Sequence, residues 1–248
     1  MLHSTMHRRD FLKAGTATGV AMSAAGCLDV GPLSSSPGAT DDVVLEKPEQ
    51  YDDLRSARDE GALEYPIHAD PLPEATVPAP LHDREVTTTE FVGDRHVLMT
   101  FIFTRCPNAC QLLTDALRHV QDESVEDGFA DDVAFMPVTF DPEHDTADKL
   151  RAHGERHGVI REPDHWYYLR PDGPERADEV VNGQFGIGFE YLSPEEREER
   201  ELGEDMFFQH ISAILLANKD GYVERLYTGQ EASPVTLVDG VETLRERW

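Results

Sequence analysis

The feature that most constrains the fold is an apolar run at residues 97–103, Val-Leu-Met-Thr-Phe-Ile-Phe. A run with so little polar alternation is typical of a strand that is buried on both faces in a parallel-type sheet. The run leads through Thr104 and Arg105 into residues 106–110, Cys-Pro-Asn-Ala-Cys, and apolar residues then recur at helical spacing over residues 108–121. The pattern predicts an α/β domain with two cysteines at a strand-to-helix junction.

The remaining patterns predict the same fold class. Strands are expected at residues 85–89, 96–103, 133–140, 165–170, 211–217 and 222–227, and helices at residues 52–59, 108–121, 146–157, 175–182 and 234–247. Residues 193–205 are expected to form a solvated, charged helix inserted before the last hairpin. With a cysteine pair after the first core strand, this order predicts a thioredoxin-like α/β sandwich, in which helices flank a central mixed β-sheet.

The formal net charge is −27, from 49 acidic against 22 basic residues. The acidic residues are spread between strand-like apolar runs, so they indicate a folded domain with an acidic, hydrated surface rather than a disordered tail. Such a surface is typical of proteins from salt-loving organisms, because dissolved salt screens the self-repulsion. Nucleic acid is a poor partner for this chain, because phosphate binding needs a basic stripe and the sequence has none.

The N-terminus carries the pattern of an export signal. Residues 8–13, Arg-Arg-Asp-Phe-Leu-Lys, match a twin-arginine motif, and the uncharged residues 14–26 are too short and too mildly apolar for a spanning helix. Residues 24–27, Ala-Ala-Gly-Cys, resemble a lipoprotein cleavage box with Cys27 as the lipidated residue, although the usual leucine is replaced by Ala24. We therefore expect export by the twin-arginine route and a lipid anchor on the outer face of the cytoplasmic membrane.

These signals divide the chain into three parts. Residues 1–26 are interpreted as the twin-arginine signal with its lipobox. Residues 27–60, rich in Ser, Pro, Gly and acidic side chains, are interpreted as a flexible tether. Residues 61–248 are expected to form the folded domain.

The cysteine loop indicates thiol chemistry of one of two kinds. A thiol at a helix N-terminus has its thiolate favoured by unpaired backbone N–H groups and the helix dipole, and a thiolate is both a nucleophile and a soft metal ligand. Disulfide oxidoreductases of this fold typically have two residues between their cysteines, whereas Cys106 and Cys110 are separated by three. The wider loop suits two sulfurs on one metal ion as well as a disulfide, so the spacing leaves both readings open.

His210 favours the metal reading. It immediately precedes the apolar run 211–217, so in a thioredoxin-like topology it faces the cysteine loop. Thioredoxin-type reductases have a cis-proline near this position, but residues 205–217 contain no proline. Cys106, Cys110 and His210 would supply two thiolates and an imidazole, a set that suits copper in either oxidation state. A closed zinc site normally has four protein ligands, and the sequence offers no evident fourth.

Other histidines and aspartates of the sequence are interpreted as surface or structural residues rather than as parts of a site. His153 and His157 are spaced i, i+4, but no third ligand is apparent, so both are interpreted as surface residues. Asp141 and Asp145 are interpreted as part of a capped loop after a strand rather than as an acid–base pair. Arg105, beside the first cysteine of the loop, could lower the pKa of that thiol.

Three segments of the chain resemble the Sco/SenC family. Residues 100–110, Thr-Phe-Ile-Phe-Thr-Arg-Cys-Pro-Asn-Ala-Cys, are similar to its cysteine motif. Residues 135–146, Phe-Met-Pro-Val-Thr-Phe-Asp-Pro-Glu-His-Asp-Thr, are similar to its next strand and the Asp-Pro-x-x-Asp-Thr segment. His210, with the downstream Lys-Asp-Gly turn, resembles its histidine region. The chain departs from the family pattern at Gln111, where proline is frequent, and at Gln209, where aspartate is frequent.

The resemblance implies a membrane-tethered, thioredoxin-like protein of haloarchaeal type. It implies that Cys106, Cys110 and His210 bind Cu(I) or Cu(II), and that the protein serves assembly of the dinuclear copper centre of cytochrome c oxidase. The partner would be the copper-receiving oxidase subunit, and the protein a metallochaperone rather than an enzyme with turnover. The alternative is an extracytoplasmic thiol–disulfide oxidoreductase, with Cys106 as nucleophile and Cys110 as the resolving thiol in a transient disulfide. A thiol peroxidase is a third, weaker option.

Overall fold

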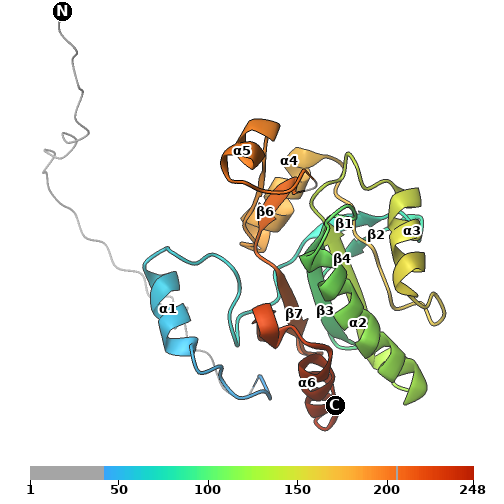
Figure 1. Ribbon diagram of the computed structural model, residues 1–248. Coiled ribbons are helices and arrows are strands. Elements are labelled where there is room, and N and C mark those ends of the chain that lie inside the picture. The colour runs from blue at the N-terminus through green and yellow to red at the C-terminus, as the bar shows by residue number, and fades with distance from the viewer. Residues whose placement is uncertain (1–41, 205) are drawn as a thin grey trace, which may run out of the picture. The chain divides into compact units, whose positions relative to one another are not determined.

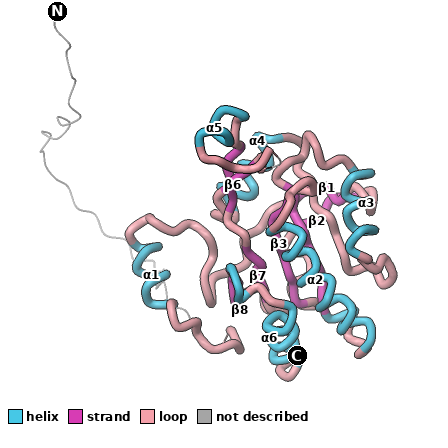
Figure 2. Tube along the Cα trace, in the orientation of Figure 1, coloured by secondary structure: helices cyan, strands magenta, loops and turns pink. Residues whose placement is uncertain are grey.

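The computed structural model describes residues 42–204 and 206–248, which lie in one compact unit. Its centre is a four-stranded sheet with the strand order β4-β3-β7-β8 (Figures 1 and 2). The strands are β3 (His96–Ile102), β4 (Val133–Thr139), β7 (Ala213–Ala217) and β8 (Val223–Thr228). β3 pairs with β4 in parallel and with β7 antiparallel, and β7 pairs with β8 antiparallel. The predicted mixed central sheet is therefore confirmed.

Helices cover both faces of the sheet. α2 (Ala109–Glu126) and α6 (Pro234–Arg245) pack against each other, and Gly240 of α6 approaches Leu216 of β7. Met99 and Phe101 point to the opposite face, because side chains alternate along a strand. There the ring of Phe101 contacts Phe185, which follows α4 (Pro174–Ala177) and a π-helical segment, Asp178–Gln184. Because both faces are covered, every residue of β3 and β4 is buried, as the continuous apolar runs predict.

Irregular segments cover the two edges of the sheet. Along β8, the Ala69 N–H donates to the Val223 carbonyl oxygen, and the Val223 N–H donates to the Asp70 carbonyl oxygen, both at 2.8 Å. Along β4, the predicted strand 165–170 is present only as isolated parallel bridges, including one between Val138 and Leu169. These segments take up backbone groups that an open edge would leave unpaired.

The chain before the sheet packs on the domain. The backbone N–H groups of Val44 and Leu45 donate to the buried Glu224 carboxylate, each at 2.9 Å. α1 (Tyr51–Asp59) follows at the predicted position. Part of the segment interpreted as a tether therefore contacts the domain. Cys27 and the twin-arginine motif lie outside the described residues, and within those residues no helix has the length and hydropathy needed to span a membrane.

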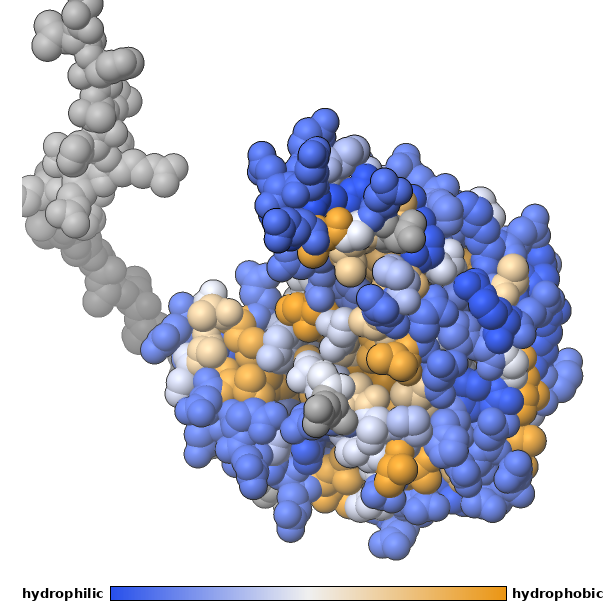
Figure 3. All heavy atoms as spheres, viewed as in Figure 1, coloured by the Kyte–Doolittle hydropathy of each residue, from blue (hydrophilic) through white to orange (hydrophobic). Residues whose placement is uncertain are grey.

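The remaining elements surround this core. A hairpin of β1 (Thr76–Ala79) and β2 (Arg84–Thr87) precedes β3, and α3 (Ala147–His157) follows β4 with Thr146 as its N-cap. A second hairpin joins β5 (Phe189–Tyr191) to β6 (Phe208–His210). Between them lies α5 (Pro194–Glu199), shorter than the helix predicted over residues 193–205. Short 3₁₀ turns occur at Ala130–Asp132 and Gly229–Glu231. Hydrophilic residues cover most of the face shown in Figure 3, in keeping with the charge of −27.

Candidate metal centre

Both cysteines of the loop lie where β3 gives way to α2. Cys106 is 4% exposed and Cys110 is fully buried, and neither forms a disulfide. α2 begins at Ala109, and the N-cap residue Asn108 makes no side-chain capping hydrogen bond. The Cys110 N–H instead points to the Cys106 Sγ at 3.5 Å. The first turn of the helix is thus directed at a sulfur, a position that favours a thiolate.

His210 approaches the sulfurs from the end of β6. Its Nε2 lies 3.7 Å from the Cys110 Sγ. The ring meets Phe103 edge-on at a centroid distance of 5.9 Å and lies against Phe140 at 5.0 Å. The Nδ1 lies 3.2 Å from the Ile211 carbonyl oxygen. In the tautomer that donates from Nδ1 to this carbonyl, the Nε2 lone pair faces the sulfurs and is available to a metal.

The structure brings together the three residues that the sequence singled out. The two sulfurs and a ring nitrogen of Cys106, Cys110 and His210 all lie within 4.8 Å of one another. Within the described residues, this is the one group of three or more histidine, cysteine or acidic side chains arranged in this way. Two nearly buried sulfurs and one imidazole, with no carboxylate among them, fit a soft metal ion.

The two thiols have opposite acidities. The pKa of Cys106 is lowered to about 4, chiefly by a hydrogen bond from the Cys110 side chain, with further contributions from His210 and backbone N–H groups that outweigh desolvation. Burial raises the pKa of Cys110 well above its usual value, and the neighbouring Cys106 raises it further. Of the two groups, Cys106 is therefore the one that more readily becomes a thiolate.

Two aspartates hold the segment that precedes the cysteines. Asp145 is fully buried and accepts hydrogen bonds from the Thr104 N–H at 3.0 Å and from the Thr104 and Thr139 hydroxyls at 2.5 and 2.6 Å. The Arg105 Nε donates to Asp141 Oδ2 at 2.8 Å. The Arg105 guanidinium also lies 3.7 Å from the Phe207 ring centre, so its polar contact is with Asp141 rather than with a thiol. The interpretation of the aspartates as structural agrees with these contacts.

Two histidines of α3 differ from their interpretation as surface residues. His153 is fully buried, and its Nδ1 lies 3.0 Å from the Tyr168 hydroxyl, so the interpretation is wrong for this residue. The side chain of His157 is only 6% exposed, and its Nε2 lies 2.8 Å from the Gln111 Oε1. The sequence alone gives no sign of this link, because it joins positions 46 apart on two helices, for which no local pattern exists.

Gln209, one of the two departures from the family pattern, does not contact His210 through its side chain. It is exposed, and its Oε1 accepts a hydrogen bond from the Arg200 Nη1 at 2.8 Å. Adjacent side chains of a strand point to opposite faces, so the side chains of Gln209 and His210 diverge. The substitution therefore places an uncharged group outside the cluster.

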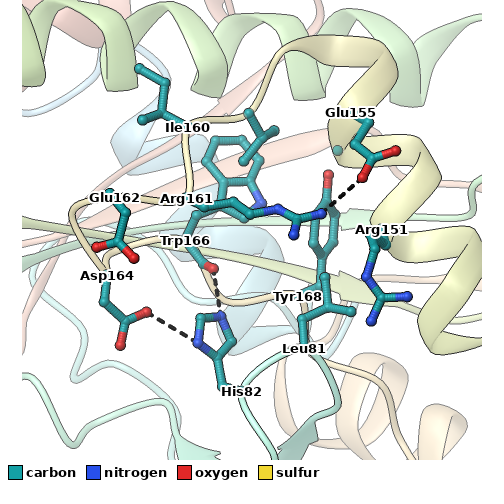
Figure 4. Close-up of a pocket in the computed structure, with 12 residues that line it drawn as sticks. Leu81, His82, Arg151, Glu155, Ile160, Arg161, Glu162, Asp164, Trp166 and Tyr168 are labelled. Carbon is teal, nitrogen blue, oxygen red and sulfur yellow. Dashed lines mark hydrogen bonds and ion pairs between the residues drawn. The ribbon is translucent and has the colours of Figure 1, made fainter.

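One pocket lies apart from the cluster. It measures about 390 Å³ and lies between α3 and the turn that joins β1 to β2 (Figure 4). One wall is held by His82, which contacts the Trp166 carbonyl oxygen at 3.0 Å and Asp164 at 3.1 Å. A groove of about 500 Å³, lined in part by Phe140 and Tyr191, lies on the side of the cluster where the Phe140 ring contacts His210.

Comparison with known proteins places this geometry in context. A family model described as SCO1/SenC matches residues 81–246. A SCO1/SenC family lipoprotein from Bacillus anthracis aligns at 18% identity with a TM-score of 0.56, over 71% of this chain and 95% of its own. ScoI of Arabidopsis thaliana, solved with copper bound, aligns at 18% identity with a TM-score of 0.53, over 72% and 98%. BsSco, described as having a disulfide switch, aligns at 21% identity with a TM-score of 0.53, over 71% and 96%.

No curated protein matches the chain. At identities near 20%, the solved structures establish the fold alone, and the predicted thioredoxin-like sandwich is confirmed.

Proposed function

The chain belongs to the SCO1/SenC family, and on that premise we propose that it is a copper metallochaperone for assembly of the dinuclear copper centre of a respiratory cytochrome c oxidase. The observation that carries the proposal is the convergence of Cys106, Cys110 and His210 within 4.8 Å. Two soft sulfurs and an imidazole suit copper in either oxidation state. Copper is the cargo of this site, and the receiving oxidase subunit is the proposed partner.

Each side chain has a distinct part in loading copper. Cys106, the more acidic of the two thiols, supplies the first thiolate. Cys110 loses its proton on binding, because metals bind the thiolate. His210 adds its Nε2 in the tautomer whose Nδ1 donates to the Ile211 carbonyl oxygen. Pro107 and Asn108 are exposed beside Cys106, so an acceptor can approach the site from this side.

The donor set also bears on the choice of metal. Closed structural zinc sites normally use four protein ligands. Among the described residues, the cluster has three. Structures of Arabidopsis thaliana ScoI and yeast Sco1 were solved with copper bound, which supports copper as the cargo here.

Copper titration of the reduced full-length chain tests the proposal. We expect one copper per chain and a sulfur-to-copper charge-transfer absorbance. Cys106→Ser or Cys110→Ser should abolish binding, and His210→Ala should weaken Cu(II) binding strongly. His119→Ala, at an exposed helix position, is the matched control and should bind as the wild type. Binding no tighter than that of the Cys106→Ser/Cys110→Ser double variant would exclude the chaperone function.

A thiol–disulfide oxidoreductase is the second candidate. It is supported by the two free, adjacent thiols at a helix N-terminus. In this reaction the Cys106 thiolate attacks a target disulfide and releases one target thiolate, and Cys110 then displaces the second. The target gains two electrons as the Cys106–Cys110 disulfide forms. Robust turnover of a model disulfide, together with absent copper binding, would favour this function over the first.

We further propose that the chain is exported by the twin-arginine route and anchored through Cys27. The support is the sequence pattern of residues 8–27. Cys27→Ser should release the protein from the membrane fraction and prevent incorporation of a labelled lipid. Replacement of both Arg8 and Arg9 by lysine should leave the precursor inside the cell. A Cys27→Ser variant that stays in the membrane fraction would contradict the anchor.

A further inference from the structure

The Cys106 carbonyl is held by a side chain rather than by the helix backbone. In a regular first turn this oxygen would face the Cys110 N–H, but here that N–H points to the Cys106 Sγ. The next amide, that of Gln111, donates to the Asn108 carbonyl at 3.1 Å. The Gln111 side chain turns back, and its Nε2 donates to the Cys106 carbonyl oxygen at 2.8 Å.

The other end of the Gln111 amide is also fixed. Its Oε1 lies 2.8 Å from the Nε2 of His157, the last residue of α3. The Nδ1 of His157 in turn lies 2.5 Å from the Asp115 Oδ1, one turn further along α2. An amide offers one acceptor oxygen and one donor nitrogen. The Cys106 carbonyl oxygen only accepts hydrogen bonds, so the amide nitrogen faces it and the amide oxygen faces His157.

We propose that Gln111 is a positioning residue of the Cys106–Cys110–His210 site. Its amide holds the Cys106 carbonyl, and therefore the cysteine loop, in the conformation in which the three ligand atoms converge. His157, held by Asp115, keeps the amide in the orientation that allows this contact. The inference rests on the proposed copper function, and it adds residues that touch none of the ligand atoms.

The size of the expected effect follows from the contact that is lost. Without Gln111, the Cys106 carbonyl loses this donor and the loop samples conformations in which the sulfurs diverge. A net hydrogen bond corresponds to about a 2- to 13-fold change in an equilibrium constant. Copper affinity should therefore fall by this factor in Gln111→Met, which keeps the length of the side chain and removes both polar ends.

Gln121 provides a matched control on the same helix. Its amide also joins α2 to the segment after α3, since its Nε2 donates to the Ile160 carbonyl oxygen at 2.8 Å and its Oε1 accepts from the Ile160 N–H at 2.9 Å. A histidine, His165, also lies 2.8 Å from its Nε2. Gln121 is fully buried and lies ten positions beyond Gln111. Gln121→Met should therefore lower stability without changing the site.

The experiment compares full-length variants. Cu(I) affinity is measured by competition with a chromophoric chelator, Cu(II) binding by the sulfur-to-copper absorbance, and the metal-free loop by the carbonyl ¹³C shift of Cys106. Gln111→Met should weaken Cu(I) binding about 2- to 13-fold. It should also change the sulfur-to-copper absorbance and the Cys106 carbonyl ¹³C shift. His157→Leu should act in the same direction. His157→Gln, unlike His157→Leu, should keep the wild-type affinity and ¹³C shift, because the amide introduced at position 157 can donate an N–H to the Gln111 oxygen. Gln121→Met should change only the urea midpoint.

Two results would overturn the inference. One is wild-type copper affinity in Gln111→Met together with an unchanged Cys106 carbonyl shift. The other is an equal loss of affinity in Gln121→Met, which would show a general effect of loosening α2. A wild-type protein that binds no copper would instead contradict the proposed function. The ¹³C shift of the metal-free protein would still decide whether Gln111 positions the loop.

Discussion

Asp145 holds the segment that precedes the cysteine loop by hydrogen bonds. It accepts the Thr104 N–H and two threonine hydroxyls while fully buried. Asp145→Ala leaves these donors without their acceptor, so we expect the free energy of unfolding to fall by about 2–4 kcal/mol. Urea unfolding at pH 7 and constant salt measures this. Asp148→Ala, whose side chain is 92% exposed, is the control and should change the value by less than about 0.5 kcal/mol.

His96 makes stability depend on pH. It is fully buried, neither ring nitrogen has a hydrogen-bond partner among the described residues, and desolvation is the main cause that lowers its pKa to about 4. The folded state therefore binds this proton less readily than the unfolded state, whose pKa is about 6.5. Stability is lost as the pH falls from 6.5 towards 4, at up to about 1.4 kcal/mol per pH unit from this residue.

His96→Leu should remove this contribution. We expect its free energy of unfolding to fall less steeply than that of the wild type between pH 6.5 and 4, by the equivalent of one proton. His153, whose pKa is lowered to about 3 mainly by burial, contributes in the same direction and stays in both proteins. Urea unfolding at several pH values gives the two slopes. Parallel curves for wild type and variant would show that His96 does not carry this dependence.

Some residues of the site could be predicted from the sequence and others could not. The cysteine spacing and the histidine before an apolar run were enough to single out Cys106, Cys110 and His210, which the fold brings together. Gln111 and His157 were not found as a pair, because their contact depends on how α2 and α3 pack. Helix packing is set by side chains that are distant in sequence, and a single sequence does not display such pairs.

At the scale of elements, Gly186 allows the segment before β1 to cross close to the chain after the π-helical segment. Its φ is +62°, and an added Cβ would lie 2.3 Å from the backbone carbon of Glu64. Gly186→Ala should lower the free energy of unfolding by about 2–4 kcal/mol, because both strain and overpacking act there. Thermal or urea unfolding measures the loss. Gly203→Ala meets no atom within 4 Å and should change stability by less than about 0.5 kcal/mol.

The segment that contains α5 contacts the cysteine loop through Phe207. The Arg105 guanidinium lies 3.7 Å from the centre of this ring, and that of Arg197 lies 4.8 Å from the same centre. A double-mutant cycle with Arg105→Ala and Phe207→Ala should give a coupling energy of about 0.5–2 kcal/mol. Arg151→Ala paired with Phe207→Ala is the control cycle. Additive losses in the first cycle would show that the stacking contributes nothing to stability.

Elements were predicted best where burial is continuous. β3 and β4 lie within the predicted runs, because strands buried on both faces need almost uninterrupted apolar sequence. Residues 165–170 read as a strand but form only isolated bridges at the sheet edge. Residues 193–205 read as one helix, but α5 ends at Glu199, before Gly203. Edge segments and charged helices receive less support from the core, so their extent depends on local contacts.

At the scale of the whole molecule, the charge of −27 should make stability depend on salt. Self-repulsion among surface carboxylates opposes the compact state, and salt screens it. We expect the melting temperature to rise by about 10 °C or more between 0.2 and 2 M KCl, which corresponds to a few kcal/mol for a domain of this size. Glycerol at the same osmolarity is the control, because it does not screen charge. A melting temperature that is independent of KCl would contradict the expectation of a salt-adapted surface.

One residue of the cluster is far from the other two along the chain, and this makes metal binding depend on folding. Cys106 and Cys110 stay close even in an unfolded chain, whereas His210 lies 100 positions after Cys110 and joins them only when the sheet has formed. Complete coordination is thus available only to a correctly folded copy. A ligand that binds only the folded state increases the population of that state by mass action. A copper-bound molecule should consequently resist proteases for longer than a copper-free one, so the lifetime of each copy would report whether copper is bound.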